Sequence, residues 1–347
     1  MPPRNRFPRR AASAFLLAGT VLLVAVLAAL WVIPSKDYIF LPDRAHPVAP
    51  LVNVAGKFPV PRGGSGGIYY VDVFVRKASL LEQLFGGLHE GADLQAPSSV
   101  VPPGVSDSQR ANLEQREMHQ SQQVALAVAL RAAGYKVKAT DTGAIVSELV
   151  SGTPAIGRLE PTDIIVAVDG KRVRSPAGVS AAMSHKRVGQ YVTFTIMRGL
   201  TRKLVRMRTV AAGPGSKRAV VGIFLEPSED IHLPIPISID AGNVGGPSAG
   251  LAFALDALQE LGHNVDHGHR VAATGEIFLN GDVGPIGGIK QKTIGAREAG
   301  VDTFLVPAGE NARDARKYAH GLRIIPVESF QQALHALAKL PPPARSS

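Results

Sequence analysis

The chain has 347 residues, of which 45% are hydrophobic, so it is too long for one small domain and too apolar to be disordered. With 38 Lys and Arg against 28 Asp and Glu, its net charge is +10, which fits a nucleic-acid binder, a membrane-surface protein or an enzyme of acidic substrates. Cysteine is absent, which excludes disulfides, thiolate nucleophiles and Cys-ligated zinc.

The N-terminal segment predicts a membrane anchor. Ala11 to Ile33 is a run of 23 residues without a charge, and as a helix it would span about 35 Å, enough for a hydrocarbon core of about 30 Å. A cleavable signal peptide is the alternative, but its apolar core is usually shorter, about 7–15 residues. Because arginines precede the run, we expect residues 1–10 in the cytoplasm, residues 11–33 in the bilayer and the catalytic part outside the cytoplasm.

The next hundred residues change from irregular to regular. Residues 34–66 are rich in proline and glycine, which predicts a linker. A strand is then predicted from Ile68 to Val75 and a helix from Asn112 to Ala133. We therefore expect residues 67–133 to be folded.

Residues 134–212 are dominated by predicted strands, with a helix at about 176–184. They resemble bacterial protease-associated PDZ domains, and the matching residues are Gly152-Thr-Pro-Ala155, Leu159, Asp163-Ile-Ile165 and Val168-Asp-Gly170. Thr162 departs from this pattern at a usual glycine position, and no carboxylate-binding loop of the Gly-Leu-Gly-Phe type precedes the first strand. The resemblance implies recognition of extended polypeptides by strand addition. A β-rich packing domain without a ligand is the alternative.

Alternating strands and helices predict an α/β domain over residues 213–340, followed by a tail at 341–347. Within it, Gly245-Gly-Pro-Ser-Ala-Gly250 turns into a helix that we expect to bury its leucine stripe and expose Asp256. Ser248 thus lies at a helix N-terminus, where N–H groups and the helix dipole favour an oxyanion. From these residues alone, it is either an ordinary N-cap or a nucleophile. No Gly-x4-Gly-Lys-Ser/Thr phosphate loop occurs in the chain.

A second segment narrows this choice. Thr274-Gly-Glu-Ile277, then Gly281 to Gly288 and Lys290-Gln-Lys292, follow the serine segment in the order and near the spacing of Lon-type Ser–Lys peptidases, which they resemble. By this resemblance Ser248 is the nucleophile, Lys292 the general base and Thr274 its neighbour; the alternative for Thr274 is an ordinary strand residue. The N–H groups of Gly246 and Ser248 are the candidate oxyanion donors. A lysine can serve as a base when burial lowers its pKa.

The whole arrangement is similar to the membrane-anchored PDZ-containing Lon-like serine proteases of bacteria. The segment Met118 to Ser121 resembles a helix that precedes the catalytic blocks of Lon-type domains, which implies that residues 67–133 belong to the protease and that the PDZ domain is inserted. The expected fold class is an α/β (α+β) Lon-type proteolytic domain with a β-rich PDZ domain, preceded by one transmembrane helix. In departure from the family, Gly245 replaces an acidic residue and Gln291 a common glutamate.

Two other clusters of residues give weaker indications of function. His263, Asp266, His267 and His269 have a metal-like spacing, yet a solvated loop fits them better, and no motif supports a triad of Ser248 with one of these histidines. Residues 171–208 hold ten basic residues and no acidic one. We expect them to form a solvated face, with anionic lipid as the alternative and nucleic acid disfavoured, because no aromatic residues interleave them.

The sequence therefore predicts an ATP-independent, membrane-tethered serine endopeptidase that cleaves unfolded or exposed polypeptides. We expect no metal, cofactor or nucleic acid, a lipid bilayer as a partner, and a homo-oligomer by resemblance. The alternative is an inactive membrane scaffold that binds exported proteins through its PDZ domain.

Overall fold

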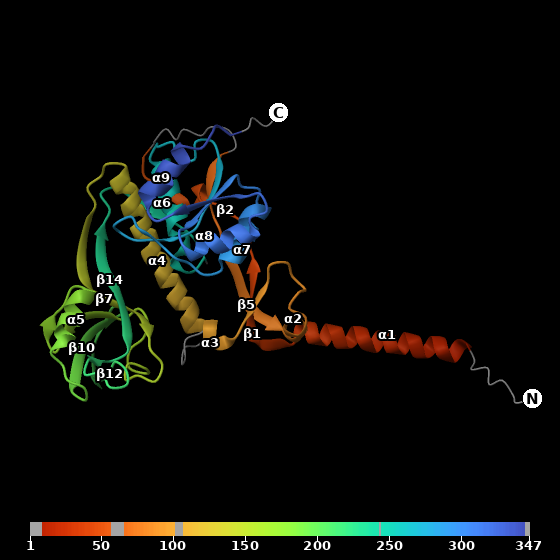
Figure 1. Cartoon of the computed structure of the whole chain (residues 1–347), viewed down its shortest axis with the longest axis horizontal. Helices are drawn as coiled ribbons and strands as arrows, with labels where there is room; N and C mark the ends of the chain where they lie inside the picture. The colour runs from red at the N-terminus through yellow and green to blue at the C-terminus, as the bar shows by residue number, and fades with distance from the viewer. Residues whose placement is uncertain (1–8, 57–65, 101–106, 243, 344–347) are drawn as a thin grey trace, which may run out of the picture.

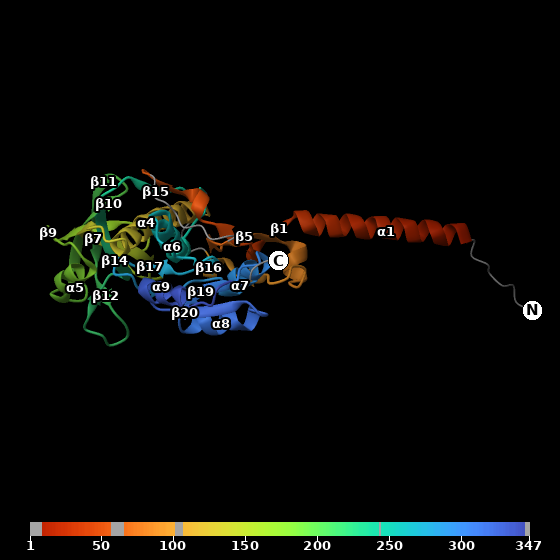
Figure 2. The ribbon, with the colours of Figure 1, turned by 90° about the horizontal axis from the view of Figure 1, so that it is seen from above.

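The computed structural model describes residues 9–56, 66–100, 107–242 and 244–343, without side chains at 9–16, 107–109 and 112. The expected cytoplasmic residues 1–8, the second half of the linker and the end of the tail lie outside this part. Helix α1 (Arg9–Val32) projects from the body at the end opposite the PDZ-like region (Figure 1 and Figure 2). Within the described ranges, no helix is both long and apolar enough to cross a membrane.

The body is built on a five-stranded sheet in the order β2-β4-β16-β19-β20, parallel except for β2. Alternate residues face opposite layers: Val271 and Ala273 pack with helices α4, α6 and α9, whereas Ala272 packs with α7 and α8. The result is three layers, helix on sheet on helix. The strands and helices are β2 (His46–Pro47), β4 (Gly67–Tyr70), β16 (Arg270–Ala273), β19 (Thr303–Pro307), β20 (Arg323–Val327), α4 (Asp107–Ala132), α6 (Gly250–Glu260), α7 (Ile289–Glu298), α8 (Glu310–Tyr318) and α9 (Phe330–Ala338).

The prediction of a linker over residues 34–66 is wrong for its first part. Strand β1 (Pro34–Pro42) pairs with β5 (Val73–Ser79) and β6 (Asp93–Gln95). Strand β3 (Val52–Val54), after the short helix η1 (Ala49–Leu51), pairs with β15 (Ile237–Ile239). These pairings give the segment a fixed place against the body, because each joins it to a strand distant in sequence.

The region from residue 67 to 133 contributes directly to the same body. The predicted strand Ile68–Val75 is divided into β4 and β5, which belong to different sheets, and the turn between them contains Asp72. Helices α2 (Leu80–Leu84) and α3 (Pro97–Val100) follow, and then α4 packs along α6. Asp256 of α6 is 0% exposed, so the prediction that it faces solvent is wrong: α6 packs against α4, α9 and β3 as well as the sheet, and all its residues from Gly250 to Gln259 are buried.

The PDZ-like region has its own core and an antiparallel sheet in the order β11-β10-β8-β7-β14, with β9 paired to β8. Asp163, which is 0% exposed, is bound by the guanidinium of Arg198 through Nε and Nη2, both at 2.7 Å. Thr162 has φ 73°, which explains why glycine is usual there. The elements are β7 (Lys138–Leu149), β8 (Ile164–Val168), β9 (Lys171–Arg172), α5 (Pro176–Ser184), β10 (Tyr191–Arg198), β11 (Thr201–Arg208), β12 (Val210–Ala211), β13 (Ala219–Val220) and β14 (Ile223–His232).

Candidate active site

Ser248 lies in a single 3-10 turn, η2 (Pro247–Ala249), that leads into α6. Helix α4 holds this turn from outside, because Ser121 Oγ donates a hydrogen bond to the Pro247 carbonyl at 3.0 Å. Gly250 permits the approach: a Cβ there would lie 2.7 Å from Ser121 Oγ. Packing between α4 and α6 therefore fixes the direction of the serine.

Lys292, in the first turn of α7, meets this serine from the other side. Its Nζ is 2.6 Å from Ser248 Oγ, and the lysine is 3% exposed. Burial lowers the pKa of Lys292 to about 8, although the charge of Asp72 acts in the opposite direction. About a tenth of the amine is therefore neutral at pH 7 and can accept a proton, and this fraction grows as the pH rises.

Thr274, just after β16, completes the cluster. Its hydroxyl donates to the Ser248 carbonyl oxygen at 3.1 Å and lies 3.4 Å from Lys292 Nζ. The Gly275 N–H also donates to the Ser248 carbonyl, at 2.8 Å. The structure thus brings Ser248, Lys292 and Thr274 together, as the sequence predicts.

The prediction of an oxyanion donor at Gly246 disagrees with the geometry. Its N–H already donates to the Glu114 carbonyl of α4 at 2.9 Å, so this donor is occupied. Gly246 instead supports the turn through its backbone, with φ 76°, a region that glycine adopts without strain. Ser248 N–H is in the first turn of a helix, where N–H groups have no partner within the helix.

A cleft of about 820 Å³ opens beside Pro247. It is lined by α4, by strands β7 and β14 of the PDZ-like region, and by the hairpin of β17 (Glu276–Ile277) and β18 (Val283–Gly284). Burial, followed by the charges of neighbouring glutamates, raises the pKa of Glu117 and of Glu276 to about 7. Sequence patterns do not reveal these carboxylates or Asp72, because residues from several distant elements form their surroundings.

The hydrogen bonds of the histidine-rich loop, residues 263–269, are made to groups other than Ser248 and Lys292. Asp266 accepts a hydrogen bond from Gln259 at 3.0 Å, and His269 Nε2 contacts the Pro341 carbonyl at 2.9 Å. Among the described residues, no group of three or more His, Asp or Glu could hold a metal ion. The loop therefore links α6 to the segment after α9 by hydrogen bonds. The structure gives no support to a triad that uses Ser248.

Two parts of the chain match models of known domain families. Residues 217–339 match the model of the Lon protease (S16) C-terminal proteolytic domain, and residues 132–209 match that of the PDZ domain. Lon protease 2 of Bacillus subtilis is 35% identical over 147 residues, which are 42% of this chain and 26% of that protein. Lon protease of Chloroflexus aggregans is 38% identical over 136 residues, 38% of this chain and 16% of that protein.

Among solved structures, the PDZ domain of the SdrC-like protein from Listeria monocytogenes is 24% identical, with a TM-score of 0.24, over 25% of this chain and 92% of that domain. The chain thus covers 26% of the length of one of these Lon proteases and 16% of the length of the other. Residues 217–339 are therefore similar to the proteolytic domain of Lon proteases, which indicates a serine peptidase, and residues 132–209 are similar to a PDZ domain.

Proposed function

We propose that this protein is an ATP-independent, membrane-tethered serine endopeptidase that uses a Ser248–Lys292 dyad. The observation that carries the proposal is the 2.6 Å contact between Ser248 Oγ and the buried amine of Lys292. ATP independence is supported by the sequence, in which no phosphate-binding loop occurs.

The reaction follows from the geometry. Neutral Lys292 accepts the Ser248 hydroxyl proton while Oγ attacks the substrate carbonyl, and the Ser248 N–H stabilises the resulting oxyanion. The ammonium of Lys292 then donates its proton to the leaving amine as the peptide C–N bond breaks. A water molecule, deprotonated by the same lysine, hydrolyses the acyl-enzyme and restores the serine. Thr274 contacts both the Ser248 carbonyl and Lys292 Nζ through its hydroxyl and so keeps the two residues aligned.

The PDZ domain is proposed to recognise polypeptide substrates. Strand β14 ends the sheet order, so one of its edges has no strand partner within the described sheet. A second cleft, of about 610 Å³, lies between α5 and the start of β14, with Lys217 and Arg218 at its border. An extended peptide can add to such an edge through main-chain hydrogen bonds.

Tethering is proposed from the uncharged run between Ala11 and Ile33 and from the arginines before it, with the catalytic part outside the cytoplasm. A homo-oligomer is proposed by resemblance to Lon-type domains. A C-terminal reporter that is active only in the cytoplasm tests this orientation, and a positive signal would contradict it.

Cleavage of a fluorescently labelled unfolded protein by the purified full chain, without nucleotide, tests the dyad. We expect Ser248→Ala and Lys292→Met to abolish cleavage, since each removes one half of the proton transfer. Ser99→Ala and Lys339→Met are matched controls at exposed positions and should cleave as the wild type does. Residual activity of either dyad variant equal to its control would reject the assignment, and a wild type that binds peptides without cutting them would favour the scaffold.

A further inference from the structure

A loop that precedes β6 lies directly against the start of α7. The Gln291 amide donates to the Gly91 carbonyl at 3.0 Å and to Asp93 Oδ2 at 2.8 Å. Lys290 Nζ donates to Asp93 Oδ1 at 2.7 Å and to the Ala92 carbonyl at 3.2 Å. One carboxylate therefore joins the two residues that immediately precede Lys292.

These bonds bear on the position of the catalytic amine. Gln291 is 2% exposed, so loss of its partners would leave a buried amide unsatisfied, which proteins rarely tolerate. Asp93 also places a negative charge near the N-terminus of α7, where the helix dipole favours it. Lys292 itself is in the same turn, with its N–H bonded to the Gly288 carbonyl at 3.0 Å.

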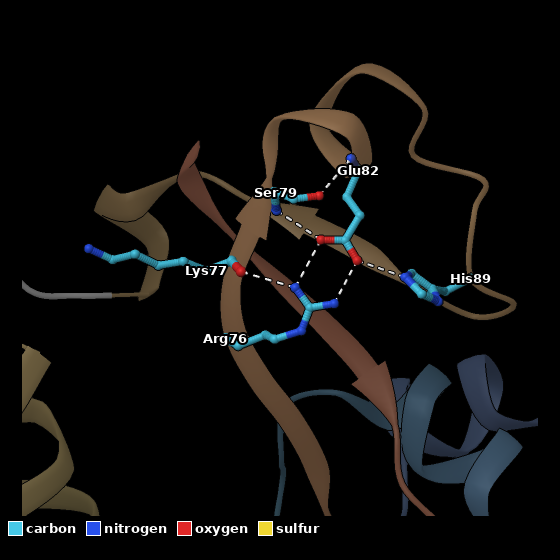
Figure 3. Close-up of polar contacts among 5 residues, drawn as sticks. All are labelled: Arg76, Lys77, Ser79, Glu82 and His89. Atoms are coloured by element: carbon cyan, nitrogen blue, oxygen red, sulfur yellow. Dashed lines mark hydrogen bonds and ion pairs between the residues drawn. The ribbon is translucent and has the colours of Figure 1, made fainter. Parts of the chain in front are cut away.

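The loop has firm attachments of its own. Buried Glu82 accepts two hydrogen bonds from Arg76, at 2.9 and 2.6 Å, and contacts His89 at 2.7 Å (Figure 3). Its carboxylate also accepts the Ser79 N–H in a capping box. At the other end of the loop, Asp93 lies opposite Phe40 of β1 in the sheet. The loop is thus held on both sides before it reaches α7.

We propose that Asp93 is a positioning residue, which acts through Gln291 and Lys290 to hold the first turn of α7 so that Lys292 Nζ stays beside Ser248 Oγ. This inference rests on the proposed Ser–Lys mechanism. Asp93 would act by orienting Lys292, since a displacement of about 1 Å at a reacting group can cost up to about 100-fold in rate.

Asp93→Ala in the full chain tests the proposal against Glu90→Ala. Glu90 is a matched control, because it lies on the same loop and binds Arg297 at the far end of the same helix, at 3.0 Å. We expect Asp93→Ala to lower kcat roughly tenfold with little change in KM, while Glu90→Ala leaves both unchanged. Asp93→Asn, which keeps an acceptor oxygen for the Gln291 amide, should fall between the two. Equal kcat in the three variants and the wild type would overturn the proposal.

The pH at which kcat/KM rises distinguishes two effects of Asp93→Ala, displacement of Lys292 and loss of a negative charge near it. A displaced Lys292 gains water and its pKa rises, so the rise of kcat/KM with pH moves to higher pH in Asp93→Ala. Loss of the Asp93 charge alone, or of the Asp72 charge in Asp72→Asn, would move it to lower pH. A shift to lower pH in Asp93→Ala would therefore contradict the proposal.

A measurement without substrate keeps the proposal distinct from the proposed function. NMR titration of ¹³Cε-lysine-labelled protein, assigned with Lys292→Met, reports the pKa of Lys292 directly. A raised pKa in Asp93→Ala supports the positioning role even in a protein that does not cleave. If the wild type cleaves and the pKa of Lys292 in Asp93→Ala is unchanged or lowered, the positioning role is rejected and the proposed dyad stands.

Discussion

The catalytic body and the PDZ domain of this chain are stabilised in different ways. The body is assembled from strands and helices on both sides of the PDZ domain in sequence, and two of its buried polar residues, Thr274 and Lys292, meet at Ser248. The PDZ domain is continuous in sequence, and the buried carboxylate of Asp163 finds its partner Arg198 within the same sheet. We therefore expect damage to the PDZ domain to stay local and damage to the body to reach the active site.

The largest expected effect is local to the PDZ domain. Asp163→Ala leaves the Arg198 guanidinium without its buried partner and should destabilise this domain by about 3 kcal/mol. Hydrogen exchange should increase in β8 and β10, while α6 and α7 keep their protection. Glu160→Ala removes only the exposed partner of the same arginine and is the control. Equal loss of protection in α7 would refute the separation between the two regions.

The matching test in the body is Gly295→Ala. A Cβ at Gly295 would lie 1.7 Å from the Asp43 carbonyl oxygen, so α7 must move away from the segment after β1. Overpacking of this kind costs about 1–3 kcal/mol. We expect a lower midpoint in urea and loss of cleavage together. Gly287→Ala, where a Cβ meets nothing within 4 Å, should retain the wild-type midpoint.

The activity of the body should depend on pH through Lys292. The pKa of this lysine is lowered to about 8, and the base must be neutral, so kcat/KM should rise up to about tenfold per pH unit below pH 8 and then level off. Initial rates between pH 6 and 9.5 check this expectation. A profile that is flat over this range would exclude Lys292 as the base.

A smaller effect on stability should come from the cleft between the two regions. The pKa of Glu117 is raised to about 7 from 4.5, so between these values the folded state binds more protons than the unfolded state. Stability from this group is therefore present at low pH and lost as pH rises from about 4.5 to about 7. Urea unfolding of Glu117→Gln against wild type at pH 5 and pH 8 measures it. A difference that is the same at both values would contradict the raised pKa.

The smallest expected effect is on short peptides after removal of the PDZ domain. Gly143 pairs with Ser228 across β7 and β14, so a two-residue turn between them would close the ribbon and delete the domain. Hydrolysis of a short peptide should be unchanged, whereas cleavage of an unfolded protein should decrease. Loss of peptide hydrolysis in a folded deletion variant would show that the PDZ domain is part of the active site.

Local sequence patterns predicted what depends on neighbours in sequence. The strands and helices after residue 220 alternate as expected, and the glycine-rich turn places Ser248 at the start of α6. The pairing of Ser248 with Lys292 came from family resemblance, since no spacing rule brings together residues 44 apart. Family blocks thus supplied the long-range contact that periodicity could not.

The errors share one physical cause, contacts made across long sequence distances. The proline and glycine content of residues 34–66 predicts a linker, yet strands β1 and β3 of this segment pair with strands distant in sequence. The same applies to Asp256, which is buried because several elements surround α6, and to Gly246, whose N–H donates to the Glu114 carbonyl. Periodicity describes how one element is patterned and carries no information about which element will cover it.

The ribbon of β7 and β14 has a mechanical consequence. The chain enters the PDZ domain through β7 and leaves it through β14, and both strands also line the 820 Å³ cleft beside Pro247. Irregular register at Ser228/Glu229 interrupts the ladder near that cleft, and such interruptions bend a strand pair. We expect tilting of the PDZ domain on this ribbon to change the width of the cleft, so that the bending stiffness of two strands limits the thickness of polypeptide that reaches Pro247.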